Sequence, residues 1–556
     1  MPGYWQHQLI RLLVRAGEAR FRRSEGQLEA IQRPRLGAIL QHVASATHGP
    51  GRGVNPRWSW AEFASAVPVT RYDDWADAID QQMATQRATL SGSPMMRYQP
   101  TSGSSSAIKW IPYTQQFLRE LDAAISPWMS DLYRRYPGVR QGRHYWSLSW
   151  LPTDMRDRAQ GQLNDDMKLL SSGKRLLVSG TQAVPESVAL ATTSDDSLFA
   201  TLAYLASQRD LSALSVWSPT FALGLLQKLA QWRDELVQVL RFGRWGAREQ
   251  ALGHMPAPRS VLAADLLKSW SGQWDGPDAP LFYQAFWPQL ALVSAWDTAT
   301  ATRWARQLRS LLPHAAFQGK GLWATEGVVS FPYGDDSVLA ASSHFYEFED
   351  VASGQIIPAW RLEKGQQVVP LLTTGSGLLR YRLGDQVEVS GFRGQLPCLT
   401  FLGRDGSTDM VGEKLSTAAV QQALNQLPWP PGVSPVVVLA VERASAAGRP
   451  GYVLLAQAVS DASQLQLARW SEGLADALEV LLTEHFHYRL ARNLGQLAKV
   501  ACLCRPNAYQ YYLGACRSRG MIDGNLKTEA LRHWSGALPG TPAAQLRPSQ
   551  AMEVPL

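Results

Sequence analysis

The sequence predicts an α/β protein, with a large N-terminal α/β domain and a smaller, mobile C-terminal α+β domain. Three observations favour this class: a chain of 556 residues, alternating helix-like and strand-like runs over about the first 400 residues, and a change of pattern after Phe401. A chain of this length exceeds the size at which one hydrophobic core keeps growing. We therefore expect two domains, residues 1–403 and residues 404–556.

The N-terminal region begins with helical periodicity and then turns to strands. Residues 1–90 have the spacing of amphipathic helices, with loops around residues 50–55. Extended runs at 95–99 and 110–113 flank a polar loop rich in Gly and Ser, and helical spacing returns over residues 117–133. The pattern predicts helices, a strand pair and a further helix in that order.

Helices and short strands alternate in the rest of the large domain. The cap residue Ser218 and Pro219 at the first helical position predict a helix over residues 221–240. Strand-like runs follow at residues 289–294, 327–331, 338–341, 367–372 and 386–389. Such alternation is typical of an α/β domain.

The C-terminal region has a different order of elements. A Pro-rich break at residues 428–435 precedes two strands, a long helix and another strand, expected at residues 436–441, 452–456, 462–485 and 497–504. This β-β-α-β order fits a small α+β domain. The tail after about residue 535 is rich in Pro, Gly, Ala and Gln, and we expect it to be disordered.

The composition narrows the classes of partner. A net charge of +7 suits an anionic ligand such as a nucleotide, but Lys and Arg are dispersed along the chain, so we expect no nucleic acid. The densest basic patch, Arg11 to Arg23, reads as the solvated face of an amphipathic helix. The four Cys have neither zinc-site spacing nor a disulfide framework, and no apolar run suits a signal peptide or a bilayer span. We expect a cytoplasmic protein with no membrane partner.

A loop of small hydroxyl residues is the first candidate site. It comprises Thr101, Ser102, Gly103, Ser104, Ser105 and Ser106, with Lys109 shortly after. Small residues around a Gly let backbone N–H and hydroxyl donors surround a phosphate, and Lys109 adds a positive charge. The second element of a Walker A loop is missing, and the loop taken alone also fits a flexible linker.

Four further positions carry polar groups suited to a nucleotide site. Glu326, beside Thr325, is a carboxylate at a strand–loop junction, where oxygen ligands suit Mg²⁺. Asp385 can accept two hydrogen bonds from a ribose diol. Arg404 lies among glycines where the domain pattern changes, which suits a hinge. Taken singly, each also fits an ordinary turn, and Lys527, on a Gly-containing loop, also fits solvated surface.

Together these segments resemble a known family. The matching stretches are TSGSSSAIKWIPYT, ATEG, HFYEFED, LLRYRLGDQVEVSGF with LTFLGRDGS, and YRLARNLGQL followed by RGMIDGNLKTEAL. In this order, over about residues 98–531, they resemble the adenylate-forming superfamily of acyl-CoA synthetases, luciferases and adenylation domains. Within it they look most like the Gretchen Hagen family of acyl acid amido synthetases.

The resemblance implies an ATP- and Mg²⁺-dependent ligase that converts a carboxylic acid to its acyl-adenylate and passes the acyl group to an amine, such as an amino acid. It assigns ATP phosphates to Thr101–Ser106 with Lys109 nearby, phosphate to Thr325, Mg²⁺ to Glu326 and ribose to Asp385. Arg404 would reach the nucleotide from the hinge, and Lys527 would stabilise the adenylation transition state. The large domain would bind ATP and the acid, and the small domain would move between half-reactions.

The sequence departs from the family pattern at the loop and at the adenine position. Ser106 replaces a Gly, and Leu322 replaces the usual aromatic, so Trp323 becomes a candidate for stacking on adenine. The acyl pocket is expected around residues 145–150, 296–300 and 344–348, with Trp146, Trp296, Thr300, His344, Phe345 and Tyr346 as candidates. Two alternatives remain open: acyl transfer to a thiol of coenzyme A or a carrier protein, and a catalytically silent nucleotide-binding homologue.

Overall fold

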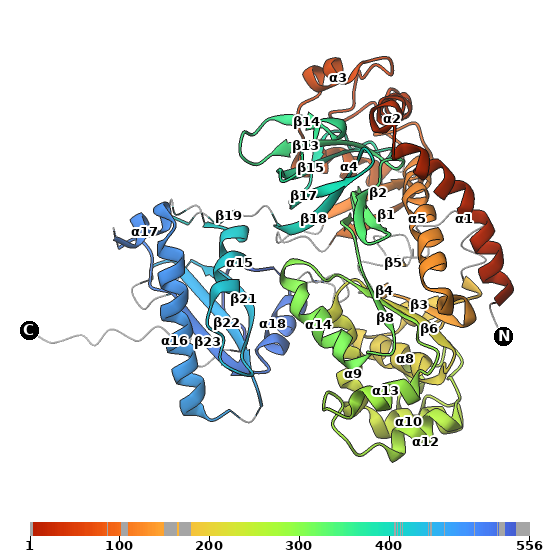
Figure 1. Cartoon of the computed structure of the whole chain (residues 1–556), viewed down its shortest axis with the longest axis vertical. Coiled ribbons are helices and arrows are strands. Elements are labelled where there is room, and N and C mark those ends of the chain that lie inside the picture. The colour runs from red at the N-terminus through yellow and green to blue at the C-terminus, as the bar shows by residue number, and fades with distance from the viewer. Residues whose placement is uncertain are drawn as a thin grey trace, which may run out of the picture. The chain divides into compact units, whose positions relative to one another are not determined.

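The computed structural model describes residues 4–540 apart from residues 86, 102–108, 150–163, 166–178, 405–406, 409, 412, 414, 443, 445–447, 461, 494, 520 and 522–528. The described chain divides into two compact units, one reaching Leu402 and one starting at Gly403. Both units mix helices and strands (Figure 1). This mixture confirms the predicted fold class.

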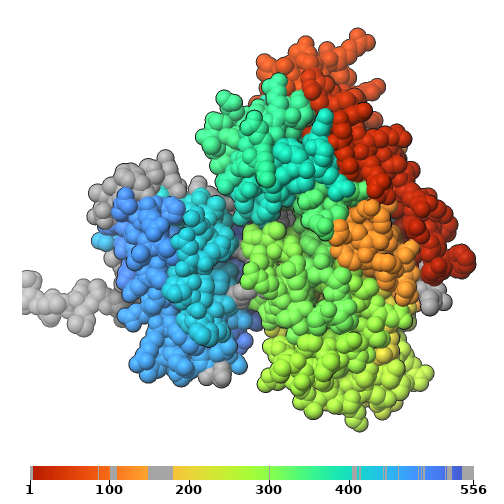
Figure 2. All heavy atoms as spheres, viewed as in Figure 1, coloured from red at the N-terminus to blue at the C-terminus, as the bar shows by residue number. Residues whose placement is uncertain are grey.

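The first unit opens with helices and a hairpin. The elements are α1 (Tyr4–Ser24), α2 (Leu28–Val43), α3 (Trp60–Ala66), α4 (Asp73–Thr85), β1 (Met95–Thr101), β2 (Lys109–Thr114) and α5 (Gln115–Arg135). Helix α1 packs along α5 and lies on the surface of its unit (Figures 1 and 2). The Thr114 hydroxyl accepts the Phe117 N–H and starts α5. The predicted order of helices, strand pair and helix is confirmed.

A parallel sheet follows in the same unit. Strands β3 (Arg143–Trp146), β6 (Leu211–Ser215), β7 (Leu292–Ala295) and β8 (Ala316–Gly319) pair in this order, all parallel. The helices among these strands are α8 (Ser194–Ser207), α9 (Pro219–Gln231), α10 (Arg233–Phe242), α11 (Glu249–Leu252), α12 (Val261–Ser269), α13 (Ala279–Phe286) and α14 (Thr302–Leu311). A short pair, β4 (Leu148–Ser149) with β5 (Asn164–Asp165), follows β3. Parallel neighbours need such crossover connections.

Two sequence predictions in this region need correction. The helix expected over residues 221–240 is two helices, α9 and α10, separated at Trp232. Trp232 is buried and packs edge-to-face on Phe199, so tertiary packing overrides the helical pattern there. The strand expected at 289–294 begins only at Leu292, because a turn from Trp287 comes before it.

The largest sheet is antiparallel. It contains β11 (Ser330–Tyr333), β12 (Asp336–Leu339), β13 (Phe345–Asp350), β14 (Ile356–Pro358), β15 (Gln367–Thr373), β16 (Tyr381–Arg382), β17 (Asp385–Arg393) and β18 (Leu396–Arg404). The order is β11-β12-β18-β17-β15-β13-β14, with β16 beside β15. A separate hairpin pairs β9 (Trp323–Ala324) with β10 (Gly327–Val328). The strand predicted at 327–331 is therefore divided between β10 and β11.

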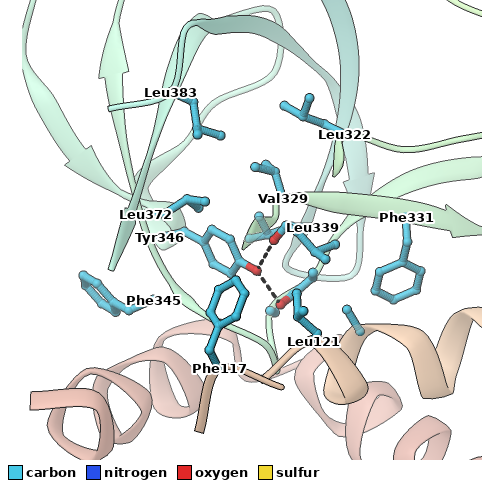
Figure 3. Packing of buried hydrophobic residues seen from close by; sticks show 14 of the residues in the cluster. Phe117, Leu121, Leu322, Val329, Phe331, Leu339, Phe345, Tyr346, Leu372 and Leu383 are labelled. Carbon is cyan, nitrogen blue, oxygen red and sulfur yellow. Dashed lines mark hydrogen bonds between the residues drawn. The ribbon is translucent and has the colours of Figure 1, made fainter. Parts of the chain in front are cut away.

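Helix α5 covers a core shared with this sheet (Figure 3). Phe117 and Leu121 point from the helix toward Tyr346 and Leu372 of the strands. The Tyr346 hydroxyl lies inside this core and makes two hydrogen bonds, drawn as dashed lines in Figure 3. A buried tyrosine hydroxyl needs such partners, so this position is fixed by polar as well as apolar contacts.

The second unit has its own sheet and core. Its sheet has the order β23 (Ala501–Pro506), β22 (Gly451–Ala458), β21 (Ser434–Val441) and β24 (Leu531–Trp534). The central pair is antiparallel and both outer strands pair parallel to it. The other elements are β19 (Ser407–Thr408), β20 (Leu415–Ser416), α15 (Thr417–Gln426), α16 (Gln464–Thr483), α17 (Phe486–Asn493) and α18 (Ala508–Arg517). The predicted β-β-α-β order is confirmed. The part of the tail after residue 540 lies outside the described residues.

Among the described helices, none combines the length and the apolar character that crossing a bilayer requires.

Candidate functional site

The β1–β2 hairpin frames the hydroxyl-rich loop. Thr101 and Lys109 are the last paired residues of the hairpin, so the loop from Ser102 to Ser106 begins directly after β1. That loop and the Thr101 side chain lie outside the described residues. At the hairpin end, the Lys109 Nζ atom is 5.5 Å from the centroid of the Tyr72 ring. The Tyr72 hydroxyl accepts the Trp110 N–H at 2.9 Å. Tyr72 thus holds the base of the predicted phosphate loop.

Thr325 and Glu326 form the two-residue turn of the β9–β10 hairpin, because Ala324 pairs with Gly327. The Tyr113 hydroxyl donates to the Thr325 carbonyl at 2.9 Å, and the Tyr381 hydroxyl donates to Glu326 Oε1 at 3.2 Å. Two tyrosines from β2 and β16 therefore fix this turn. The Glu326 carboxylate is half-buried, so it remains accessible to a ligand.

The negative charge of Glu326 contributes to the raised pKa of two tyrosines. Burial raises the pKa of Tyr381 well above its usual range, and the charge and hydrogen bond of Glu326 raise it further. Burial also raises the pKa of Tyr72, with Glu326 among the negative charges that add to the shift. Both phenols are protonated at neutral pH, and that of Tyr381 donates to Glu326. The link between the β1–β2 hairpin and the Glu326 turn is the hydrogen bond from the Tyr113 hydroxyl of β2 to the Thr325 carbonyl.

The Glu326 turn fits a magnesium ion bound together with substrate phosphates. Among the described residues, no three His, Cys, Asp or Glu side chains gather as a metal cage. Mg²⁺ usually keeps several waters and binds through one or two carboxylates plus substrate phosphates, so a single accessible carboxylate is a suitable protein ligand.

The remaining predicted nucleotide residues lie on other segments. Asp385 is the first residue of β17, four residues after Tyr381, and only 3% of its surface is exposed. Arg404 is the last residue of β18, and its side chain lies outside the described part. Lys527 lies among residues 522–528, which the structure does not describe. The structure thus links the turn of Thr325 and Glu326 to the hairpin that carries Lys109, through the Tyr113 hydroxyl.

Three residues expected in the acyl pocket are core residues. His344, Phe345 and Tyr346 are fully buried in the core around the antiparallel sheet. The ring of Phe345 packs edge-to-face on Phe63, and Phe117 stacks on His344. Their burial removes them from the acyl pocket proposed below. The side chain of Thr300, another candidate, lies outside the described residues.

A cluster of indoles gathers at the carboxyl ends of the parallel strands. We define the indole cluster as Trp128, Trp146, Trp217, Trp296 and Trp323. Trp146 ends β3, whereas Trp217 and Trp296 follow β6 and β7 and are joined by a backbone hydrogen bond of 2.9 Å. Ligands of open parallel sheets bind outside the carboxyl ends of the strands. The cluster is therefore a candidate pocket wall for a flat ligand.

Lys320, directly after β8, places a cation in the indole cluster. Its Nζ atom lies 4.5 Å from the Trp217 ring centroid and 5.5 Å from that of Trp128. The same atom donates to the Ser215 hydroxyl at 2.8 Å. Cation–π contacts and this hydrogen bond orient the ammonium at the strand ends. An aromatic surface and a positive charge therefore lie side by side at the strand ends.

A cavity of about 360 Å³ opens beside Lys320. Its lining includes Asp297, Gln318, Leu322 and Phe401. Burial raises the pKa of Asp297, and the Arg309 guanidinium at 2.8 Å opposes that shift. Leu322 lines the cavity, whereas the Trp323 ring faces Trp128 and Trp217 in the indole cluster. The two residues considered for the adenine position therefore face different surroundings.

Several site residues were missed by reasoning from the sequence. Tyr113 and Tyr381 lie inside two of the matched motifs, so their hydroxyls could have been considered from those stretches. Tyr72, Trp128 and Lys320 carry no motif signal, because only the tertiary fold brings them to the site.

Two family models and several known proteins match this chain. The family described as "GH3 family N-terminal domain" matches residues 18–317, and "GH3 family central domain" matches residues 337–404. An "Indole-3-acetic acid-amido synthetase GH3.8" from Oryza sativa subsp. indica is 24% identical over 72% of this chain and 70% of its own. "Indole-3-acetic acid-amido synthetase GH3.15" from Arabidopsis thaliana is 22% identical, covering 68% of each chain. The solved structure "AtGH3.15 acyl acid amido synthetase in complex with 2,4-DB" has a TM-score of 0.76 at 20% identity and covers 94% of both chains.

Proposed function

This chain belongs to the GH3 family, and on that premise we propose that it is an ATP-dependent acyl acid amido synthetase. It would activate a carboxylic acid as an acyl-adenylate and then form an amide with an amine. The family membership agrees with the resemblance to the Gretchen Hagen family. The observation that carries the proposal is the contact between the loop-bearing β1–β2 hairpin and the Glu326 turn, where the Tyr113 hydroxyl donates to the Thr325 carbonyl and Tyr381 donates to Glu326.

The first half-reaction joins the acid to the α-phosphorus of ATP. A carboxylate oxygen attacks this phosphorus, the bond to the bridging oxygen breaks, and pyrophosphate leaves. Donors of the loop at Thr101–Ser106, together with Lys109 and Lys527, would neutralise the charge that grows on the phosphates. The tyrosine donors to the Glu326 turn keep this carboxylate in place while the charge moves.

Glu326 would hold Mg²⁺ through the carboxylate oxygens, while Thr325 would contact phosphate and Asp385 the ribose. Bound Mg²⁺ supplies charge neutralisation and orientation of the phosphates. If adenine enters the cavity beside Lys320, Leu322 is the residue in contact with it, since Trp323 faces the indole cluster.

The indole cluster supports an aromatic acid as the acyl donor. Trp217, Trp296 and Trp323 are partly exposed, so their rings can contact a flat ligand. Lys320 places a positive charge among these rings, where it suits a carboxylate. Relatives named for indole-3-acetic acid are in keeping with this choice. Of the predicted acyl residues, Trp146 and Trp296 remain in the proposed pocket.

The second half-reaction transfers the acyl group. An unprotonated amine attacks the acyl carbon, AMP leaves, and the amine loses a proton. The adenylate is a mixed anhydride that water hydrolyses, so the second domain would shield it and then reposition for the acceptor, with Arg404 at the hinge. Amino acids are the acceptors we propose.

The test is a pyrophosphate-release screen of carboxylic acids with MgATP, with parallel arms containing amino acids, coenzyme A or hydroxylamine. The proposal expects release with aromatic acids, and mass spectra that show amides with amino acids. Thioester formation with coenzyme A would support the thiol alternative instead. If no acid triggers release, the chain is a nucleotide-binding homologue without this activity.

A further inference from the structure

We infer that Glu120 and His344 form a positioning pair that sets the place of the Glu326 carboxylate. The inference rests on the proposed function, because it assigns the pair a role in the magnesium response of that site. Both side chains are fully buried, so neither meets the substrate. They act through the backbone that follows the Glu326 turn and through the loop that leads to Tyr381, the donor to Glu326.

His344 holds the strand that follows Glu326. The His344 Nε2 atom accepts the Val328 N–H at 3.2 Å, and Nδ1 lies 2.8 Å from Glu120 Oε2. A backbone N–H can only donate, so Nε2 carries the lone pair and Nδ1 carries the hydrogen that is donated to Glu120. The contact on Val328 lies two residues beyond Glu326, at the base of the turn.

Glu120 holds a second segment that also reaches Glu326. The same Oε2 atom accepts the Gly375 N–H at 2.9 Å, and Oε1 accepts from the Gln116 amide at 3.2 Å. Gly375 lies in the loop between β15 and β16 that leads to Tyr381, whose hydroxyl donates to Glu326. The Glu120 carboxylate therefore links two segments. Through His344 it holds the backbone at Val328, and directly it holds the loop that leads to Tyr381, the hydrogen-bond donor to Glu326.

Tyr346 binds the second backbone polar group of Val328. Its hydroxyl donates to the Val328 carbonyl at 2.6 Å, so both backbone polar groups of this residue are bound by side chains of the β13 region. Figure 3 shows the Tyr346 hydroxyl at the centre of the core, with α5 below it. A strand residue with both groups fixed in this way has little freedom to shift the neighbouring turn.

Close packing at two glycines shows how tightly the pair is enclosed. A Cβ at Gly327 would lie 2.8 Å from His344 Nε2, and a Cβ at Gly375 would lie 2.6 Å from Glu120 Oε1. These separations are too short for real Cβ contacts, so each segment approaches the pair only because a glycine is present. The strand that follows the Glu326 turn and the loop that leads to Tyr381 therefore both pack directly on the pair.

The experiment compares His344→Gln with His344→Asn. Gln places its terminal amide near the position of Nε2 and can still accept the Val328 N–H. Asn places its terminal amide near the position of Nδ1, so it can still donate to Glu120 but no longer accepts the Val328 N–H. The readouts are the Mg²⁺ concentration for half-maximal acid-dependent ATP–pyrophosphate exchange, binding of MgATP by calorimetry, and the melting temperature. His144→Gln is the matched control, because His144 is also buried but contacts the Val139 carbonyl far from Glu326 in the chain.

We expect His344→Asn to raise the Mg²⁺ requirement by about 10-fold, the scale of losing a partner that orients a metal ligand, while His344→Gln stays within about 3-fold of the wild type. His144→Gln should lower the melting temperature without changing the Mg²⁺ requirement. Equal Mg²⁺ responses for the two His344 variants would overturn the inference, whatever their melting temperatures. If either fails to fold, Glu120→Gln is used, and an unchanged Mg²⁺ requirement in that variant has the same consequence.

The outcomes separate the inference from the proposed function. A wild type that neither binds MgATP nor catalyses exchange would remove both. A wild type that exchanges, with Glu326→Gln impaired and the His344 variants alike, would leave the proposed function standing and remove only the positioning pair.

Discussion

The Glu326 turn and the indole cluster lie in the same unit and differ in how they are held. The turn and the strand after it are held by hydrogen bonds from Tyr113 and Tyr381 and to His344 of the buried Glu120–His344 pair. The indole cluster is held by ring contacts at centroid distances of 5.4–6.0 Å and by the Lys320 ammonium. Directional contacts fix the turn, whereas the cluster relies on apolar packing.

This difference suggests a division of labour. Phosphate and magnesium chemistry needs charges placed within fractions of an ångström, and a hydrogen-bonded turn supplies such precision. Choice of an acid by its shape needs an apolar surface whose side chains can vary without disturbing the chemistry. Changes at the turn should therefore alter adenylation for every acid, and changes at the cluster should alter the preference among acids.

The largest effect is expected from Lys527→Ala. If this residue is the cation that neutralises the ATP phosphates, as proposed, its loss should reduce acid-dependent ATP–pyrophosphate exchange by about 100-fold or more for all acids. The fold should remain intact, as measured by circular dichroism. Exchange at the wild-type rate would remove Lys527 from the mechanism.

Glu326→Gln comes next. The amide keeps the shape but loses the charge, so exchange at a fixed low Mg²⁺ concentration should fall by about 10- to 100-fold and recover in part at high Mg²⁺. The measurement is a Mg²⁺ titration of the exchange rate with several acids. A loss confined to one acid would break the proposed division between turn and cluster.

Trp217→Ala should act on only one class of substrate. Removing this ring should lower kcat/KM for aromatic acids by on the order of 10-fold and leave ATP binding unchanged. Trp274→Ala is a suitable control, since Trp274 packs on Trp270 and Phe282 outside the indole cluster. Equal losses for aromatic and short aliphatic acids would argue against a ring-binding role.

The smallest effect is a loss of folding stability at acidic pH, caused by two buried histidines near the indole cluster. Burial lowers the pKa of His144 to about 3 and also lowers that of His7, whose ring lies 4.5 Å away. Because the unfolded chain binds these protons more readily, the free energy of unfolding should fall as the pH drops below about 6.5 and continue to fall toward pH 3. The slope from His144 approaches about 1.4 kcal/mol per pH unit well below pH 6.5, and His7 adds to the loss in the same direction.

Denaturant titrations from pH 7 to pH 5 measure this slope. His144→Gln removes one titrating group, so its unfolding free energy should depend less steeply on pH than that of the wild type. Parallel curves for the two proteins would show that His144 does not contribute.

Much of the fold could be predicted from sequence patterns, because helical spacing, Pro219 and the C-terminal Pro-rich break act locally. The division of the helix at Trp232 could not, since it depends on a ring packed against Phe199 from another helix. The residues of the candidate site also differ in whether the sequence alone could identify them. Glu326 and Lys109 lie in motifs, whereas Glu120 and Lys320 gain their roles only when distant segments meet. His344 was expected in a pocket because its motif neighbours are aromatic, and the fold buries it instead.

The most direct test of the account is exchange of labelled pyrophosphate into ATP, measured with an aromatic carboxylic acid and Mg²⁺ but without any amine. Formation of an acyl-adenylate makes the first half-reaction reversible, so label should enter ATP only when acid is present. Amide formation without such exchange, or with ADP and phosphate as products, would contradict activation through an adenylate.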